Sequence, residues 1–329
     1  MRVLKVLFAI ALVVAIIVGV IYWLRTRPRE VPTPFVTQGR LQVYALDVGQ
    51  GDSSLIITPE GKSVLIDAGP PQAGDEVVAA LQKKNIKSLD LAVATHPHAD
   101  HIGGMRSVLE NVEVKNFLDS GQNFASNEYE RLLRAINEKQ IKFIEAKKGM
   151  KFDLDSGVKL EALNPQGDGQ WITKVRSGGS VENANSVVLL LSYGGFSMLF
   201  TGDAEFETEA LMMKSSAPLG ARALRVGHHG SRHATSGRFL ETVAPEAAII
   251  SCGAGNRYGH PAQQTLDRLQ KAGVKIYRTD LNGAIAIITD GTKFEIHTAK
   301  QQPIQVALSV PRAVASVESV PRAVASVSP

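Results

Sequence analysis

The sequence predicts an α/β protein in which two β-sheets lie between helices. Three observations support this fold class. Short apolar runs of strand length alternate with segments of helical periodicity through most of the chain. Glycines and polar residues follow many of the apolar runs, as expected where strands of a layered fold end in loops. Hydrophobic residues make up 44% and charged residues 21% of the 329 residues, which is the composition of a globular protein with a sizeable core.

The individual elements follow from these patterns. Residues 41–58 indicate a strand, a tight glycine turn and a returning strand. Further strands are expected at 63–66, 89–93, 114–118, 141–145, 158–163, 186–193, 196–200, 224–226, 247–251, 275–278, 284–289 and 293–297. Helices are expected at 75–84, 105–110, 127–139, 236–243 and 263–272, with a further helix beginning at Ala204. The glycine-rich segment 166–181 is predicted to be a mobile loop beside the functional site.

Residues 1–26 are predicted to be a transmembrane signal anchor. The stretch 7–24 is apolar without interruption and ends in Tyr22 and Trp23, whose rings favour the membrane interface. Arginines follow it in place of a small-residue cleavage site, so an anchor is favoured over a cleaved signal peptide. We expect a single-pass protein of the cell membrane with its body outside the cytoplasm; the alternative is a secreted protein.

The rest of the chain divides into a linker, a body and a tail. Residues 27–40 are proline-rich and predicted to be an extended linker, and residues 41–300 form the folded domain. Residues 301–329 contain a direct repeat and are predicted to be disordered. The net charge of +4 belongs to the ends, because residues 31–308 carry 29 basic and 30 acidic side chains. The composition therefore shows no broad cationic surface for duplex DNA.

The segment Thr95-His-Pro-His-Ala-Asp-His-Ile-Gly-Gly104 contains four potential metal ligands. It follows the apolar run at 89–93, and Pro97 disfavours helix for His96, so we expect the ligands on a loop at the strand's end. Imidazole and carboxylate groups suit zinc, manganese or iron. His96 and His98 can bind one ion, while Asp100 and His101 can turn toward a second. The single Cys252 excludes an internal disulfide and any cysteine-based zinc knot.

Polar residues at later strand ends are candidates to complete this site. Asp203 follows a strand at Thr-Gly-Asp, where its carboxylate can bridge two cations. The alternative is that it caps the helix expected to begin at Ala204. We favour His229 as a metal ligand and His228 as a donor to a substrate oxygen. His260 is expected to protonate the leaving group or bind substrate, the alternative being a structural bond to a backbone carbonyl.

Three motifs in the right order resemble the metallo-β-lactamase superfamily: His96-Pro-His-Ala-Asp-His101, Thr201-Gly-Asp203 and Gly227-His-His-Gly230. More narrowly, Leu46-Asp-Val-Gly-Gln-Gly-Asp-Ser53, Val226-Gly-His-His-Gly-Ser231 and Tyr258-Gly-His-Pro261 resemble the hydrolase domain of ComEC-type competence proteins. The resemblance covers 41–297. It implies a four-layer αββα sandwich whose edge holds two divalent metal ions, with zinc favoured and manganese as the alternative.

Two features depart from the families. Many members of the competence subgroup have aspartate where this chain has His98. The superfamily often has a further histidine ligand before the bridging aspartate, whereas no histidine lies between His101 and His228. Asn183 or Asn185 occupies that region.

We therefore expect a membrane-anchored hydrolase that uses a metal-activated water on a phosphodiester such as DNA. Its metal ligands would be His96, His98, Asp100, His101, Asp203 and His229. Its catalytic residues would be Asp100, His228 and His260, with Ser231, Asn185 and Tyr258 contacting substrate. The alternatives are a small-ester hydrolase (a phosphorylcholine esterase or lactonase) and a non-catalytic DNA-uptake module. The sequence indicates no protein partner.

Overall fold

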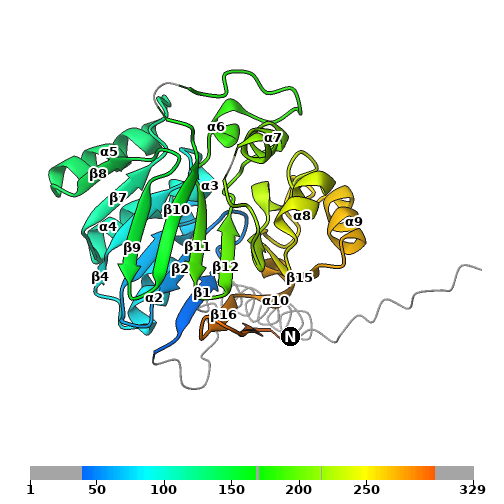
Figure 1. The fold of residues 1–329 in the computed structure, drawn as a ribbon. Helices are drawn as coiled ribbons and strands as arrows, with labels where there is room; N and C mark the ends of the chain where they lie inside the picture. The colour runs from blue at the N-terminus through cyan, green and yellow to red at the C-terminus, as the bar shows by residue number, and fades with distance from the viewer. Residues whose placement is uncertain (1–38, 168–169, 216, 301–329) are drawn as a thin grey trace, which may run out of the picture.

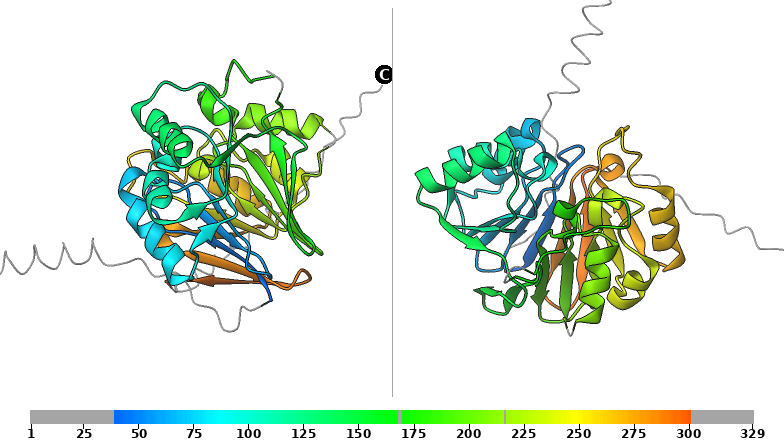
Figure 2. Two further views of the ribbon diagram at one scale, coloured as in Figure 1. Left: turned by 90° about the vertical axis from the view of Figure 1, so that its left-hand side faces the viewer. Right: turned by 90° about the horizontal axis from the view of Figure 1, so that it is seen from above.

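The computed structural model describes residues 39–167, 170–215 and 217–300. Two β-sheets face each other, and helices cover the outer face of each sheet (Figure 1). Seen from above in Figure 2, the cyan helices lie on one side of the paired sheets and the yellow to orange helices on the other. The chain therefore forms the α/β sandwich that the sequence predicts.

The first sheet has eight strands in the order β17-β16-β1-β2-β3-β5-β7-β8. Strands β17 to β3 pair antiparallel, whereas β3, β5, β7 and β8 pair parallel. The strands are β1 (Leu41–Ala45), β2 (Ser54–Ile57), β3 (Ser63–Ile66), β5 (Leu91–Ala94), β7 (Asn116–Asp119), β8 (Lys142–Glu145), β16 (Ile285–Thr289) and β17 (Phe294–Thr298). The last two strands of the described residues thus complete a sheet that includes the first described strand, β1.

The second sheet has seven strands in the order β15-β14-β13-β12-β11-β10-β9. Strands β9 to β12 pair antiparallel, and β12 to β15 pair parallel. They are β9 (Lys151–Asp155), β10 (Val158–Asn164), β11 (Val188–Tyr193), β12 (Phe196–Phe200), β13 (Ala223–Arg225), β14 (Ala247–Ile250) and β15 (Lys275–Arg278). A separate two-stranded sheet pairs β4 (Ser88–Leu89) with β6 (Glu113–Val114).

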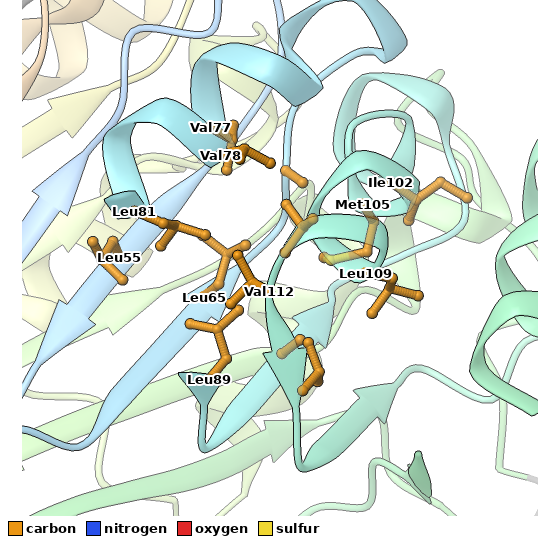
Figure 3. Packing of buried hydrophobic residues seen from close by; sticks show 14 of the residues in the cluster. Leu55, Leu65, Val77, Val78, Leu81, Leu89, Ile102, Met105, Leu109 and Val112 are labelled. Atoms are coloured by element: carbon orange, nitrogen blue, oxygen red, sulfur yellow. The ribbon is translucent and has the colours of Figure 1, made fainter. Parts of the chain in front are cut away.

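Burial on both faces explains why the central strands are mostly apolar. Val43 of β1 faces the core between the sheets, whereas its neighbour Tyr44 faces the helices. The longer helices are α2 (Gly74–Lys83), α4 (Met105–Asn111) and α5 (Asn127–Glu138) on the first sheet, and α7 (Phe206–Lys214), α8 (Gly237–Val243) and α9 (Gln263–Lys271) on the second. Figure 3 shows Val77, Val78 and Leu81 of α2 packed toward Leu65 of the sheet.

Short helices lie in the connections: η1 (Pro71–Ala73), α3 (Ala99–Ile102), α6 (Val181–Ala184), η2 (Gly227–Gly230) and α10 (Thr279–Asn282). The predicted strands are present within a few residues of their expected bounds, but β9 was not predicted. The expectation that all four ligands of 96–101 lie on a loop is wrong in one respect, because Asp100 and His101 belong to α3. The helix expected at Ala204 begins at Phe206, so Asp203 is not its cap.

The predicted anchor at 1–26, most of the linker and the tail at 301–329 lie outside the described residues. Among the helices of residues 39–167, 170–215 and 217–300, none has the length and apolar character needed to cross a bilayer.

Candidate metal centre

The predicted ligands converge from both sheets at one end of the sandwich. His96 and His98 follow β5, and Asp100 and His101 lie in the short helix α3. Asp203 follows β12, while His228 and His229 follow β13 within η2. β5 lies in the first sheet and β12 and β13 in the second, and the contacts of Asp203 with His96 and His101 show that the carboxyl ends of these strands meet. The carboxyl ends of parallel strands are where α/β folds place ligands. Figure 1 shows α3, α6 and α7 gathered there.

The carboxylate of Asp203 lies at the middle of this cluster. Its Oδ1 is 3.2 Å from His101 Nε2 and 3.7 Å from His229 Nε2. Its Oδ2 is 3.7 Å from both His96 Nε2 and His228 Nε2. Each oxygen therefore faces a different pair of imidazoles, an arrangement in which the carboxylate could bridge two cations.

Of three overlapping groups of possible donor atoms among the described residues, two include candidate ligands from both sheets. One comprises His96, His101 and Asp203, the other Asp100, His101 and His229, and the atoms of each group lie within 4.8 Å of one another. His98 Nδ1 is 3.1 Å from His96 Nε2 and adds a further donor on that side. Asp203 Oδ1 is buried and has no hydrogen-bond partner among the described residues. This orphaned oxygen amid imidazoles and carboxylates fits divalent zinc, manganese or iron.

Outer hydrogen bonds fix the tautomers of three imidazoles. His101 Nδ1 donates to Asp67 Oδ2 at 2.7 Å, and His229 Nδ1 donates to the carbonyl of Ser251 at 3.1 Å. Thr95 Oγ1 donates its own proton to Asp67, so it can accept from His96 Nδ1, 3.1 Å away. When these imidazoles are neutral, as metal binding requires, these partners favour the proton on Nδ1 and leave the lone pair of Nε2 pointing into the cluster. Such outer partners are typical of histidines that bind metals.

The backbone of η2 is unusual at the two histidines. His228 (φ 48°, ψ 49°) and His229 (φ 54°, ψ 23°) both adopt the left-handed conformation, which residues other than glycine enter rarely. Each such residue costs about 1–3 kcal/mol and persists where the surroundings impose it. The left-handed backbone at these two consecutive residues brings both imidazoles to the cluster from a single short segment.

The two carboxylates of the cluster are held ionised. Burial raises the pKa of Asp100, but the hydrogen bond to His229 and the charge of His101 outweigh it and lower the pKa below its usual range. Burial likewise opposes ionisation of Asp203, yet the charges of His101 and His228 hold its pKa well below the usual range. Ionised carboxylates amid imidazoles are the form that binds cations.

His228 has its own partners on the side away from Asp203. Its Nδ1 lies 3.1 Å from Oε1 of the buried Glu205, and the amide of Asn183 lies 3.3 Å from the same ring nitrogen. Burial lowers the pKa of His228, but the charge of Asp203 and the hydrogen bond to Glu205 outweigh it and raise the pKa above its usual value. An imidazole in this environment is suited to donate a proton near neutral pH.

A cavity of about 340 Å³ opens onto the cluster. Its lining consists of the residues Gln50, His98, Ala99, Asp100, Asn183, Asp203, His228, His229, Tyr258 and His260. Burial and the charges of His228 and His229 lower the pKa of His260 to about 4, so this imidazole is neutral at physiological pH. Its ring lies 5.4 Å from that of His228, which places it beside the cluster as the sequence led us to expect.

Tyr258 stands at the rim of this cavity with 55% of its surface exposed. Its ring stacks on His260 with centroids 5.8 Å apart. The guanidinium of Arg257 lies 5.1 Å from the Tyr258 centroid and donates to its hydroxyl at 3.0 Å. A cation and an exposed aromatic ring therefore lie together at the entrance.

Two residues predicted to contact substrate do not line the cavity. The amide of Asn185 is buried and engaged by the backbones of Ile172 and Val181, so it holds the loop before α6. Ser231 is buried at the end of η2, where its Oγ accepts from the backbone of His233. Both side chains bond the local backbone, and their contact with substrate stays a prediction.

Sequence reasoning missed Asp67, Glu205 and Gln50. Asp67 ends β3 just as the ligand segment ends β5, and the two strands are parallel neighbours. An acidic residue at that position is only a weak signal, because such residues are common after strands in α/β proteins. Glu205 and Gln50 gave none, because a lone glutamate before a helix and a glutamine in a turn are ordinary surface residues.

The matched sequence family is described as the Metallo-beta-lactamase superfamily and spans residues 46–254. The chain belongs to this superfamily. Its membership and the clustered imidazoles and carboxylates together support a metal-dependent hydrolase.

Within the superfamily the chain is similar to competence proteins. It is 33% identical over 261 residues to ComE operon protein 3 of Bacillus subtilis, which covers 74% of this chain and 32% of that protein. It is 30% identical over 262 residues to competence protein ComA of Neisseria gonorrhoeae, covering 79% and 33%. Recombination protein 2 of Haemophilus influenzae is also 30% identical, over 267 residues, covering 79% and 30%. The chain thus spans about a third of the length of these relatives, and the predicted family resemblance is confirmed.

Proposed function

We propose that this protein is a membrane-anchored phosphodiesterase that cleaves a nucleic acid strand with a metal-activated water. The observation that carries the proposal is Asp203, whose two oxygens face separate groups of imidazoles. A carboxylate so placed suits a two-metal site for in-line displacement at phosphorus.

The chain offers ligands for two ions. His96, His98 and Asp203 would hold the first, and Asp100, His101 and His229 would hold the second with Asp203 shared. Zinc suits this donor set best, with manganese as the alternative. Bound there, such ions supply Lewis acidity that activates water near neutral pH and offsets negative charge on the reacting phosphate.

His228 and His260 carry the proton chemistry in this proposal. Glu205 holds His228 with Nε2 toward the cluster, where a protonated imidazole can donate to an oxygen on the reacting phosphorus. His260 is neutral and lies at the mouth of the cavity, so it can hydrogen-bond the leaving group.

The rim of the cavity favours an anionic substrate over a choline ester. An aromatic ring can bind a quaternary ammonium, but the guanidinium of Arg257 already lies against Tyr258 and would repel a second cation. The same pair suits a nucleotide strand, because Tyr258 can stack on a base while Arg257 meets a phosphate.

Location and context extend the proposal. The apolar segment 7–24 would anchor the protein in the cell membrane, with the domain at 41–300 outside the cytoplasm. Similarity to competence proteins supports a role in handling DNA at that surface. In this proposal the apolar segment contacts the membrane, and the domain at 41–300 binds a DNA strand.

A substrate panel tests this function. The 329-residue chain is assayed with a labelled single-stranded oligonucleotide, bis(p-nitrophenyl) phosphate, p-nitrophenylphosphorylcholine and an acyl homoserine lactone. Zinc, manganese and EDTA are compared. We expect metal-dependent cleavage of the oligonucleotide that EDTA abolishes. Turnover of the choline ester or the lactone without strand cleavage would refute the nuclease, and absence of bound metal would refute the metal-dependent hydrolase itself.

The rim is tested with two variants of one residue. Tyr258→Ala removes base stacking worth about 1–3 kcal/mol, so KM for the oligonucleotide should rise by about fivefold or more. Tyr258→Phe keeps the ring and should stay near the wild-type KM. Equal KM values for the two variants would contradict stacking at this position.

A further inference from the structure

We propose that the buried ion pair between Arg225 and Asp52 is a positioning device that joins the ligand-bearing segments of the two sheets and so sets the metal affinity of the centre. The inference rests on the metal centre proposed above. Neither residue faces the cavity or approaches the reacting atoms, so both act through the ligands.

The pair crosses from one sheet to the other. Arg225 is the last residue of β13, and Asp52 lies in the turn between β1 and β2. Arg225 Nη2 is 2.5 Å from Asp52 Oδ1, and the two residues are 1% and 5% exposed. They are 173 positions apart in the sequence. A buried charge pair of this kind forms only when both sheets are in place.

The Asp52 side is tied to the first ligand segment through the backbone. The N–H of Asp52 donates to the carbonyl of Asp100 at 3.1 Å, and its own carbonyl accepts from Gly69 at 2.7 Å. A Cβ on Gly51 would collide with that same Asp100 carbonyl, so the turn lies against α3 with no room to spare. Moving Asp52 therefore moves the segment that carries Asp100 and His101.

The Arg225 side is tied to the other two ligand segments. Its carbonyl accepts from Thr201 Oγ1 at 2.6 Å, two residues before Asp203. Its Nη1 donates to the carbonyl of Ile249 at 3.2 Å, two residues before the Ser251 carbonyl that orients His229. The chain then runs directly from Arg225 into η2. One guanidinium thus connects the segments that present Asp203 and His229 to the one that presents Asp100.

Charge gives the pair a second role. Oxygens of Asp52 and Asp67 and a ring nitrogen of His101 all lie within 4.8 Å of one another. Asp67 must stay a hydrogen-bond acceptor for His101 Nδ1 to keep Nε2 free. The guanidinium of Arg225 compensates the neighbouring carboxylate of Asp52, so that two like charges do not compete in a buried space.

The pairing of charges is informative because apolar side chains usually join two sheets at least as well as a buried ion pair does. The rest of the surface between the sheets is apolar, as the cluster of Val43, Ile66, Leu189 and Phe200 shows. A fixed, directional contact at the ligand segments serves positioning, which apolar packing supplies poorly.

The test compares metal affinity in matched variants of the 329-residue chain. The variants are Arg225→Met, the double variant Asp52→Asn with Arg225→Met, and Arg225→Lys. The double variant removes both charges and so avoids the buried unpaired carboxylate that destabilises the single variant. The control is Arg222→Met with Glu246→Gln, which removes a solvent-accessible pair three residues away whose atoms are also 2.5 Å apart. Circular dichroism and thermal melting establish folding, and chelator competition with Zn²⁺ and the absorption of bound Co²⁺ report the site.

We expect the folded double variant to bind its weaker metal equivalent about 10–100-fold less tightly and to show an altered Co²⁺ band. Arg225→Lys should recover part of the loss, and the control should bind as the wild type does. A folded double variant with wild-type affinity and an unchanged Co²⁺ band would overturn the inference while leaving the proposed function intact. A wild type that binds no Zn²⁺ or Co²⁺ would instead refute the metal centre on which the inference rests.

Discussion

Replacing Asp67 with asparagine tests whether the metal centre depends on the tautomer of one histidine. In the native structure Asp67 Oδ1 accepts from the N–H of Thr95 at 2.8 Å, while Oδ2 accepts from Thr95 Oγ1 and His101 Nδ1, both at 2.7 Å. Asparagine can keep the Thr95 N–H bond only by turning its amide nitrogen toward His101. Two donors would then face each other.

His101 relieves this conflict by moving its proton from Nδ1 to Nε2. That proton would point at Asp203 Oδ1, which is 3.2 Å away, and would occupy the lone pair that binds metal. Loss of an outer partner of a metal-bound histidine typically costs about 10–100-fold in affinity, which corresponds to about 1.4–2.7 kcal/mol. We expect a loss in this range for the ion held by His101.

The assay is chelator competition with Zn²⁺ at constant pH on the folded variant. Asp90→Asn is a suitable control, because Asp90 is a carboxylate of the same sheet whose partners are Ser63, Lys62 and Lys115. Turnover at rising metal concentration should recover toward wild type if only affinity has changed. An Asp67→Asn protein with an affinity within about twofold of the wild type would refute the tautomer argument.

Three further predictions concern the site and the fold around it. Asp203→Ala should reduce turnover by more than about 100-fold, because loss of a direct ligand should cost more than the largest loss seen for an outer partner of a ligand. Its circular dichroism should stay native, and turnover equal to that of the wild type would exclude a bridging role. Burial raises the pKa of Asp119 from 3.8 to about 6, so its contribution to stability is present below about pH 4 and lost as pH rises through 6. Urea denaturation should therefore show Asp119→Asn gaining about 2 kcal/mol relative to wild type between pH 4 and pH 7, and a pH-independent difference would contradict this. The added methyl group of Gly51→Ala would collide with the carbonyl of Asp100, so we expect a destabilisation of about 1–3 kcal/mol and weaker metal binding. Unchanged stability and unchanged metal affinity would show that the turn can move away without cost.

Much of the fold could be predicted because its local signals agree with its layers. The strand at 63–66 was predicted with its observed bounds, since a short apolar run between turn residues has few alternatives. β9 escaped because Lys151–Asp155 is an edge strand with alternating charged residues, so it carries no apolar run. The helix α3 escaped because four residues are too few to show a helical period.

The site was predictable where ligands are contiguous and less so where they act at a distance. The spacing within 96–101 identifies metal chemistry by itself, and the segments of Asp203 and His229 gained weight from the family resemblance. Asp67 and Arg225 carry no such mark, because a single acidic residue after a strand and a single arginine at the end of one are common in any α/β protein. Asp67 and Arg225 come next to the metal-ligand segments only when the strands pair, and that pairing cannot be read from a single sequence.

The order of strands has a consequence for how the protein matures. His96 to His101 are synthesised more than 100 residues before Asp203 and His229, and the first sheet closes only when β16 and β17 reach β1. A nascent chain therefore lacks part of the candidate ligand set until His229 has been made. The candidate metal centre is complete only after most of the domain has been synthesised and the two sheets have met.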